Sequence, residues 1–241
     1  MNDEPTRSVV LVILGATAAW LWRSGAALNY IRPSLVPYLV VSAVVLVLLG
    51  LLPPSGLLRW RPAAPREEGT GHGHLGARVG SLLIVPVLVV VLIQPAALGS
   101  YAVSGRSGVP GQSDSVFPPL APPVRGAVPM TMLEFVTRAL YDRSQSLADV
   151  RVRLVGFVAP GEGDQGYRLT RFVISCCAAD AAALQLVVHG DHRQWQRDQW
   201  LEVEGRWLRR PVAAANDPDP PLPVLTAEVV RPIPQPREPY E

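Results

Sequence analysis

The sequence has no lysine and only two cysteines in 241 residues, and each scarcity excludes a class of protein. All 22 basic residues are arginines, scattered among 20 acidic residues, so a nucleic-acid-binding role, which needs a basic cluster, is not expected. The cysteines, Cys176 and Cys177, are adjacent. A disulfide between them would close almost no loop, which argues against a structural staple. The sequence also lacks a Walker motif, an HExxH motif, a serine-nucleophile signature and Rossmann glycines, so we do not expect an enzyme.

Long apolar runs near the start of the chain stand out instead. Hydrophobic residues make up 49% of the sequence and concentrate between residues 8 and 98, whereas charge concentrates after residue 130. A membrane-spanning helix needs about 20 apolar residues. Three runs are therefore predicted to cross a bilayer: residues 8–22, 35–52 and 79–98. Pro86 and Pro95 lie inside the third run, where we expect a kink and a closely packed neighbour.

Two alternatives exist for these runs. The first run could be a signal peptide, although the acidic start and the bulky Trp20 and Trp22 oppose that interpretation. All three could instead be buried helices of a soluble protein, although three such runs exceed what a small soluble domain needs.

The arginines that flank the runs predict an orientation. Five lie on the side of the N-terminus and three on the other: Arg7, Arg59, Arg61, Arg66 and Arg78 against Arg23, Arg32 and Arg106. Because cytoplasmic loops carry the excess of arginine, we expect the N-terminus inside. The protein is thus predicted to be a multi-pass plasma-membrane protein with an extracytoplasmic C-terminal domain.

The rest of the chain is predicted to form a linker and one soluble domain. The membrane domain, residues 1–98, is followed by a linker rich in Gly, Ser and Pro at 99–129 and by the soluble domain at 130–241. Thr131 and Glu134 form a capping box at the start of a short amphipathic helix. Five strand-like segments follow: 150–158, 167–177, 183–189, 200–208 and 223–233.

Two local features complete this prediction. Residues 190–199, between the third and fourth segments, have room for a helical turn. Gly205 predicts a bulge in the fourth segment. The order of elements is typical of a small all-β, OB-like barrel.

The cysteine pair is the main candidate site. Neighbouring side chains of a strand point to opposite faces, so both sulfurs can turn toward one point only if the strand ends there. Asp180 lies three residues on, and His189 and His192 lie one strand away. Thiolate, imidazole and carboxylate together suit Zn²⁺ or Cu⁺. The alternatives are a redox pair that cycles through a strained disulfide and a buried cysteine beside an incidental one.

His72 and His74 form a second, weaker candidate site. They lie in a glycine-rich loop beside Glu67 and Glu68, and short histidine-rich tracts bind metals, although a solvated loop is the simpler interpretation. One predicted crossing separates them from the cysteine pair, so the two sites cannot share an ion.

The segment RFVISCCAADA, residues 171–181, is similar to the signature of a family of bacterial membrane proteins described as putative permease subunits, whose C-terminal domain has no known function. GHGH at 71–74, and residues 86–100 and 155–158, also resemble that family. The resemblance implies a larger polytopic permease as partner and a link to metal homeostasis.

We therefore expect an accessory subunit of a membrane permease that handles a transition metal, with zinc as the first candidate. The alternatives are an envelope thiol-redox or assembly module and a purely structural docking subunit.

Overall fold

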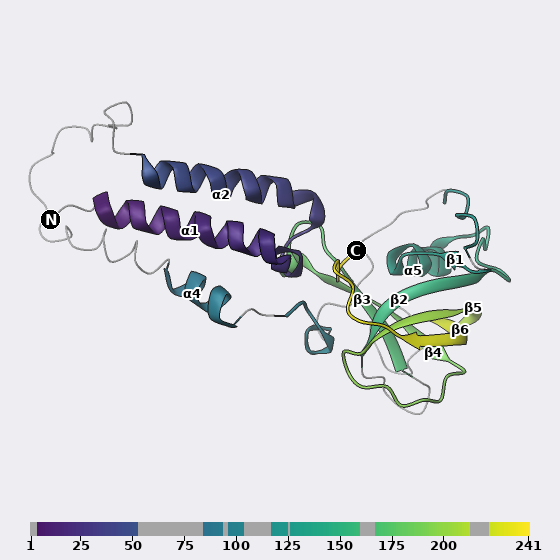
Figure 1. Cartoon of the computed structure of the whole chain (residues 1–241). Coiled ribbons are helices and arrows are strands. Elements are labelled where there is room, and N and C mark those ends of the chain that lie inside the picture. The colour runs from purple at the N-terminus through teal and green to yellow at the C-terminus, as the bar shows by residue number, and fades with distance from the viewer. Residues whose placement is uncertain are drawn as a thin grey trace, which may run out of the picture. The chain divides into compact units, whose positions relative to one another are not determined.

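The computed structural model describes residues 4–52, 84–93, 96–103, 117–124, 126–159, 167–212 and 222–241. The chain divides into two compact units (Figure 1). The helical unit comprises Met1–Ala27 and Pro33–Pro95, and the barrel unit comprises Leu28–Arg32 and Ala96–Glu241. The short segment between the first two apolar runs thus belongs to the barrel unit.

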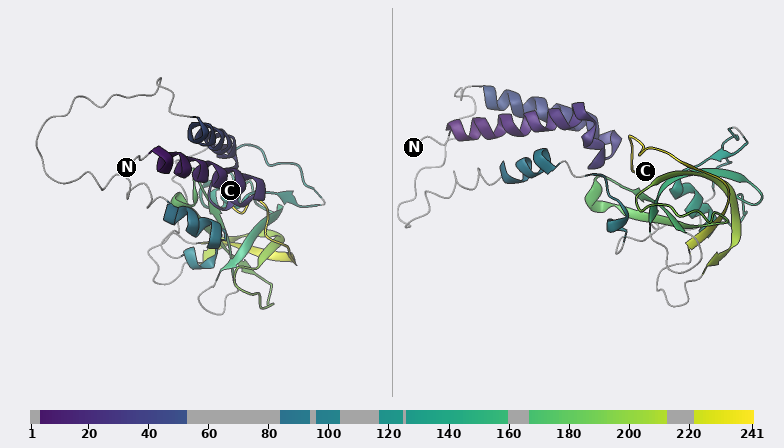
Figure 2. Two further views of the ribbon diagram at one scale, coloured as in Figure 1. Left: turned by 60° about the vertical axis from the view of Figure 1, so that its left-hand side comes forward. Right: turned by 60° about the horizontal axis from the view of Figure 1, so that its bottom comes forward.

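The helical unit contains α1 (Glu4–Ser24), α2 (Val36–Leu51) and α4 (Ile84–Ile93). Helices α1 and α2 run side by side in every view (Figures 1 and 2). Glycines allow this close approach, because a Cβ on Gly15 would lie 2.8 Å from the carbonyl oxygen of Ala43 and one on Gly50 2.9 Å from that of Ser8.

The structure supports one of the three predicted spanning helices by length and composition. Among the described residues, one helix, Pro33–Leu51, is long and apolar enough to cross a membrane, with a mean hydropathy of 2.5. A second described apolar stretch, Ser8–Ser24 in α1, is shorter than this length. In the run at 79–98, the described helix is the ten-residue α4, and residues 96–98 are not helical.

The barrel unit is a closed five-stranded β-barrel, which confirms the predicted barrel. Its strands are β2 (Arg151–Ala159), β3 (Tyr167–Val173), β4 (Ala182–His189), β5 (Trp200–Val212) and β6 (Leu222–Pro232). Their order is β2–β3–β4–β6–β5, and pairing of β2 with β5 closes the sheet. The β4–β6 pair is parallel and the other pairs are antiparallel. A two-residue strand, β1 (Val128–Pro129), pairs in parallel with β2.

Alternation along the strands fills the barrel with apolar side chains. Leu154, Leu186 and Val203 each have 0% of their surface exposed. Helix α5 (Met132–Tyr141) packs Met132 and Phe135 into the same core. The Thr131 hydroxyl accepts from the Glu134 N–H at 3.1 Å, which confirms half of the predicted capping box. The Glu134 carboxylate instead pairs with the buried Arg138 at 2.8 Å.

The segment between β4 and β5 differs from the prediction. Residues 190–199 contain no helix. Asp191 organises them, because its carboxylate accepts from the indole N–H of Trp195 at 2.8 Å and from Arg193 at 2.8 Å. These side-chain bonds offer the loop an alternative to helical backbone bonds.

The predicted bulge is confirmed, since the register of β5 against β6 shifts between Glu204 and Gly205. A Cβ on Gly205 would overlap the carbonyl oxygen of Thr226.

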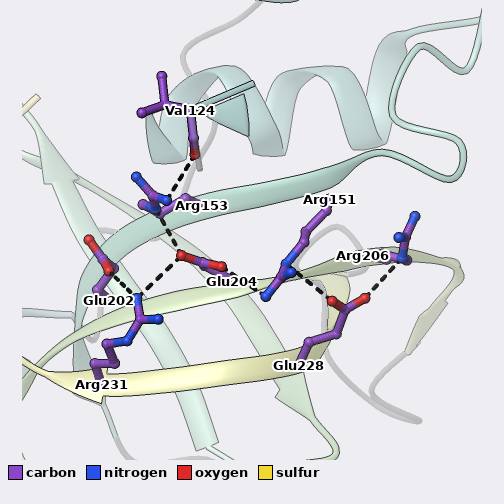
Figure 3. Close-up of polar contacts among 8 residues, drawn as sticks. All are labelled: Val124, Arg151, Arg153, Glu202, Glu204, Arg206, Glu228 and Arg231. Carbon is purple, nitrogen blue, oxygen red and sulfur yellow. Dashed lines mark hydrogen bonds and ion pairs between the residues drawn. The ribbon is translucent and has the colours of Figure 1, made fainter. Parts of the chain in front are cut away.

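A network of ion pairs covers the outer face of β2, β5 and β6 (Figure 3). At its centre is Glu204, which is 4% exposed. Its carboxylate lies 2.9 Å from Arg151, 3.1 Å from Arg153 and 3.3 Å from Arg231. Because each arginine reaches Glu204 from a neighbouring strand, the network fixes the relative register of three strands.

Candidate functional site

The cysteine pair lies in a loop that follows β3. The strand ends at Val173, earlier than the predicted end at residue 177, and the chain enters a 3₁₀ turn, η5, at Ala178–Asp180. The early end frees both cysteines from the alternation of a strand. Cys176 is exposed and Cys177 is half-buried, and both are free thiols.

The loop brings three potential ligands together. The sulfurs of Cys176 and Cys177 are 3.6 Å apart. These sulfurs and a carboxylate oxygen of Asp180 all lie within 4.8 Å of one another. Two thiols and a carboxylate therefore converge on one exposed point, as the sequence predicted for an interrupted strand.

Asp180 holds the loop in shape from within. One carboxylate oxygen accepts from the backbone N–H of Cys176 at 2.8 Å, and the other accepts from those of Ser175 at 3.1 Å and Cys177 at 3.4 Å. A carboxylate that gathers successive backbone donors fixes the direction of the chain, so Asp180 is both a potential ligand and the organiser of the loop.

The same carboxylate controls the Cys176 thiol. The hydrogen bond to Asp180, followed by that to Cys177, raises the pKa of Cys176 to about 11. The bond from Cys176 in turn lowers the pKa of Asp180, assisted by the backbone donors and opposed by desolvation. At neutral pH the site thus holds a protonated Cys176 beside an ionised carboxylate. A bound cation would favour loss of the thiol proton.

Residues Tyr30–Arg32 hold the loop from outside. Ile31 and Cys177 form an antiparallel bridge. The N–H of Arg32 donates to the carbonyl of Cys176 at 3.2 Å, and the N–H of Ala178 donates to the carbonyl of Tyr30 at 2.8 Å. Sequence reasoning missed this pairing, because backbone contacts across so long a separation leave no residue signature.

The histidines are placed elsewhere. His189 is the last residue of β4, whereas the cysteine loop precedes the first residue, Ala182. At about 3.3 Å per residue, the strand separates its two ends by roughly 23 Å. His189 and His192 are exposed. Within the described ranges, the one close group of potential metal ligands is that of Cys176, Cys177 and Asp180, and His72 and His74 lie outside those ranges.

The residues that precede the cysteines have a structural role. Arg171 is 9% exposed and donates to the carbonyl of Glu238 at 2.9 Å. Its guanidinium lies 5.3 Å from the ring centre of Trp200. Burial lowers the pKa of Arg171, and Glu241 opposes that shift. Phe172 is fully buried and stacks on Phe157 with the ring centres 5.8 Å apart. The segment 171–174 therefore anchors the base of the cysteine loop.

Residues 131–241 match the family model of the DUF1980 C-terminal domain. The match includes all five barrel strands and the cysteine loop. It supports the resemblance of the C-terminal domain to a domain family, and that family has no assigned function. No curated protein and no solved structure matches the chain.

Proposed function

We propose that this protein is an accessory subunit of a membrane permease and that its cysteine loop binds a transition-metal ion, with zinc as the first candidate. The observation that carries the proposal is the convergence of two thiols and one carboxylate within 4.8 Å on an exposed loop. Thiolates and carboxylates are common protein ligands of Zn²⁺.

The spacing of the sulfurs fits such an ion. With Zn–S bonds of about 2.3 Å and tetrahedral angles, two coordinating sulfurs lie about 3.8 Å apart. The Sγ atoms of Cys176 and Cys177 are 3.6 Å apart, so both can bind one ion with little movement. Asp180 supplies a third ligand, and the exposed side leaves a fourth position for water or for a ligand of another protein. An open position suits a site that receives and releases its ion.

The helical unit supports membrane attachment. Helix α2 and helix α4 contain no charged residue. Their exposed side chains include Val41, Leu48, Leu51, Leu88 and Leu92. We propose that the three apolar segments cross the plasma membrane and that the barrel, of OB type, lies outside. Because Leu28–Arg32 belongs to the barrel unit, the connection between the first two segments and the barrel share one side, as three crossings require. The arginines predict that this side is the outer one.

The absence of charge from α2 and α4 also favours a separate conduit. Ion pathways through membranes are lined by polar or ionisable residues. We therefore propose that a larger polytopic permease moves the ion, and that this chain presents it.

Metal analysis of the full chain, purified in detergent under reducing conditions, tests the metal site. The wild type should retain about one zinc ion per chain, and Cys176→Ser and Cys177→Ser should each lose most of it, because one ligand of a few is removed. Ser175→Ala changes the neighbouring side chain and keeps both sulfurs, so its zinc content should match the wild type. Equal zinc content in the wild type and the double cysteine variant would contradict the site.

Transport assays test the accessory role. Liposomes that contain only this chain should show no flux of zinc. Flux through them would contradict the accessory role without affecting the metal site.

A further inference from the structure

The peptide group between Cys176 and Cys177 is held at both of its polar atoms. Its carbonyl accepts from the N–H of Arg32 at 3.2 Å, and its N–H donates to Asp180 at 3.4 Å. The next N–H along the chain, that of Ala178, donates to Tyr30 at 2.8 Å. The orientation of the peptide plane is therefore set by two segments that are far apart in sequence.

This orientation suits a dithiol and opposes a disulfide. A disulfide requires the sulfurs to approach from 3.6 Å to about 2.05 Å. Between adjacent cysteines the bond closes a very small ring that contains the peptide group, which resists leaving its planar trans geometry. Closing the ring must therefore turn the carbonyl of Cys176 and the N–H of Cys177 away from their present partners. A metal ion at ordinary bond lengths requires no such rotation.

We propose that the backbone of Tyr30–Arg32 is a clamp that keeps Cys176 and Cys177 in the dithiol form. The inference rests on the proposed function for its purpose, since a metal site outside the cytoplasm has to keep its thiols reduced in an oxidising compartment. Residues Tyr30–Arg32 are then positioning residues that act through their main chain.

The reaction that the clamp opposes can be written with glutathione disulfide as the oxidant. The two cysteine S–H bonds break and the Cys176–Cys177 S–S bond forms. The two electrons and two protons pass to glutathione disulfide, whose S–S bond breaks to give two molecules of glutathione. The fraction of oxidised chains depends on the ratio of reduced to oxidised glutathione in the buffer. A weaker clamp therefore changes the ratio at which half of the chains are oxidised.

Ala178→Pro is the sharpest test in the full chain, because it deletes the clamp donor of Ala178 at a position where the backbone already suits proline. Proline is tolerated at the first position of a helix, and Ala178 is the first residue of η5. The residue before a proline has to be extended, as Cys177 already is with φ −153° and ψ 170°. Ala178→Ser keeps the N–H and is the matched control. Arg32→Pro deletes the second donor, with Arg32→Ala as its control.

Each chain is equilibrated in glutathione buffers and its free thiols are counted by alkylation and mass spectrometry. Each proline variant lacks one hydrogen bond that stabilises the dithiol. The ratio of reduced to oxidised glutathione at which half of the chains are oxidised should therefore be about fivefold higher for these variants than for the wild type. The Ser and Ala controls should follow the wild type. Proline variants that remain folded by circular dichroism and oxidise with the wild type would overturn the clamp.

A second measurement needs no variant. Oxidation of the wild-type chain should reduce the hydrogen-exchange protection of the Arg32 and Ala178 amides, and unchanged protection would also overturn the proposal. Metal content measured on the same reduced samples separates the two hypotheses. If the wild type holds no zinc but the proline variants still oxidise at a more reducing glutathione ratio, the metal site is refuted and the clamp is kept. If zinc content is normal but the proline variants oxidise with the wild type, the clamp alone is refuted.

Discussion

The side chain of Glu241 accepts a hydrogen bond from the backbone N–H of Met132 at 2.9 Å, across 109 residues of sequence. Its second carboxylate oxygen accepts from the N–H of Leu133 at 2.9 Å. These are two of the donors that the first turn of α5 leaves without a partner in the helix, where a negative charge is also favourable. The backbone of Glu241 pairs with Phe172 and Ile174, so one residue joins α5 to the strand that leads to the cysteine loop.

Glu241→Ala should therefore destabilise the barrel by about 1–2 kcal/mol, the range for loss of a helix cap. Thermal unfolding followed by circular dichroism measures the change. Glu238→Ala is the matched control, because the Glu238 side chain is exposed and its contact with Arg171 uses the backbone carbonyl. Equal losses in the two variants would contradict the capping role.

Glu204→Ala should cost more, about 3 kcal/mol, because it removes the buried carboxylate that the half-buried Arg151 and Arg153 share. Glu202→Ala removes the carboxylate that pairs with the exposed Arg231 and should cost at most about 1 kcal/mol. Urea unfolding of the two variants makes the comparison. Similar values for both would show that burial of Glu204 has no energetic weight.

The contribution of Glu204 should also depend on pH. Burial acts to raise its pKa, but Arg153, Arg151 and Arg231 outweigh burial and lower it below the usual value. The folded state thus favours the ionised form, so the stabilisation is present above the unfolded pKa of about 4.3 and is lost as pH falls through the folded pKa. Urea unfolding of wild type and Glu204→Gln should converge in acid, and a constant difference down to acid pH would contradict the assignment.

Asp180→Asn should make Cys176 more reactive. The hydrogen bond to Asp180 is the main cause of the raised pKa of Cys176, so removing the charge should lower that pKa and raise the thiolate fraction at pH 8. Alkylation of Cys176 by iodoacetamide should accelerate at least about tenfold at this pH. Asp149→Asn, at an exposed position with a left-handed backbone that Asn tolerates, is the control. An unchanged pH profile of alkylation would contradict the role of Asp180.

Substituting histidines should leave metal binding by the cysteine loop unchanged. His189→Ala and His192→Ala remove side chains that the structure does not bring into the ligand group. His72→Ala and His74→Ala remove side chains across a predicted crossing. Zinc content of the four purified variants tests this, with Cys176→Ser as the positive control. A histidine variant that loses its zinc would add that residue to the site.

The orientation predicts the behaviour of reporter fusions. A reporter active only outside the cytoplasm should be active when fused after Glu241 and silent when inserted within residues 69–75. The reverse pattern would place the cysteine loop in the cytoplasm, where cellular reductants keep thiols reduced and a backbone clamp has no oxidant to oppose.

Much of the barrel could be predicted from side-chain alternation. The predicted segment 150–158 is β2 at 151–159, and 183–189 is β4 at 182–189, because buried Val and Leu recur at alternate positions along both. Gly205 marked its bulge for a similar local reason: a side chain there would overlap the neighbouring strand.

The end of β3 could not be predicted in this way. The residues Ser175, Cys176 and Cys177 contain no proline or glycine, and the strand ends because Asp180 takes up the backbone donors that a sheet would use. His189 follows the cysteines by one strand in the sequence, which suggested that it lies near them. The cysteine loop precedes the first residue of β4 and His189 is the last, so the full length of the strand separates them in space. The clamp at Tyr30–Arg32 uses main-chain atoms, which no residue pattern identifies.

The hydroxyl of Tyr240 donates to the carbonyl of Asn29 at 2.9 Å and accepts from the N–H of Leu98 at 2.9 Å. The first of these contacts spans 211 residues. At a synthesis rate of about 5–20 residues per second, the ribosome needs roughly 10–40 s to make that intervening chain. The carbonyl of Asn29 therefore has no Tyr240 to bond until long after the first apolar segment has been made. Cys176 and Cys177 are made late in the same interval, so the proposed clamp can close on them only shortly before Tyr240 reaches Asn29.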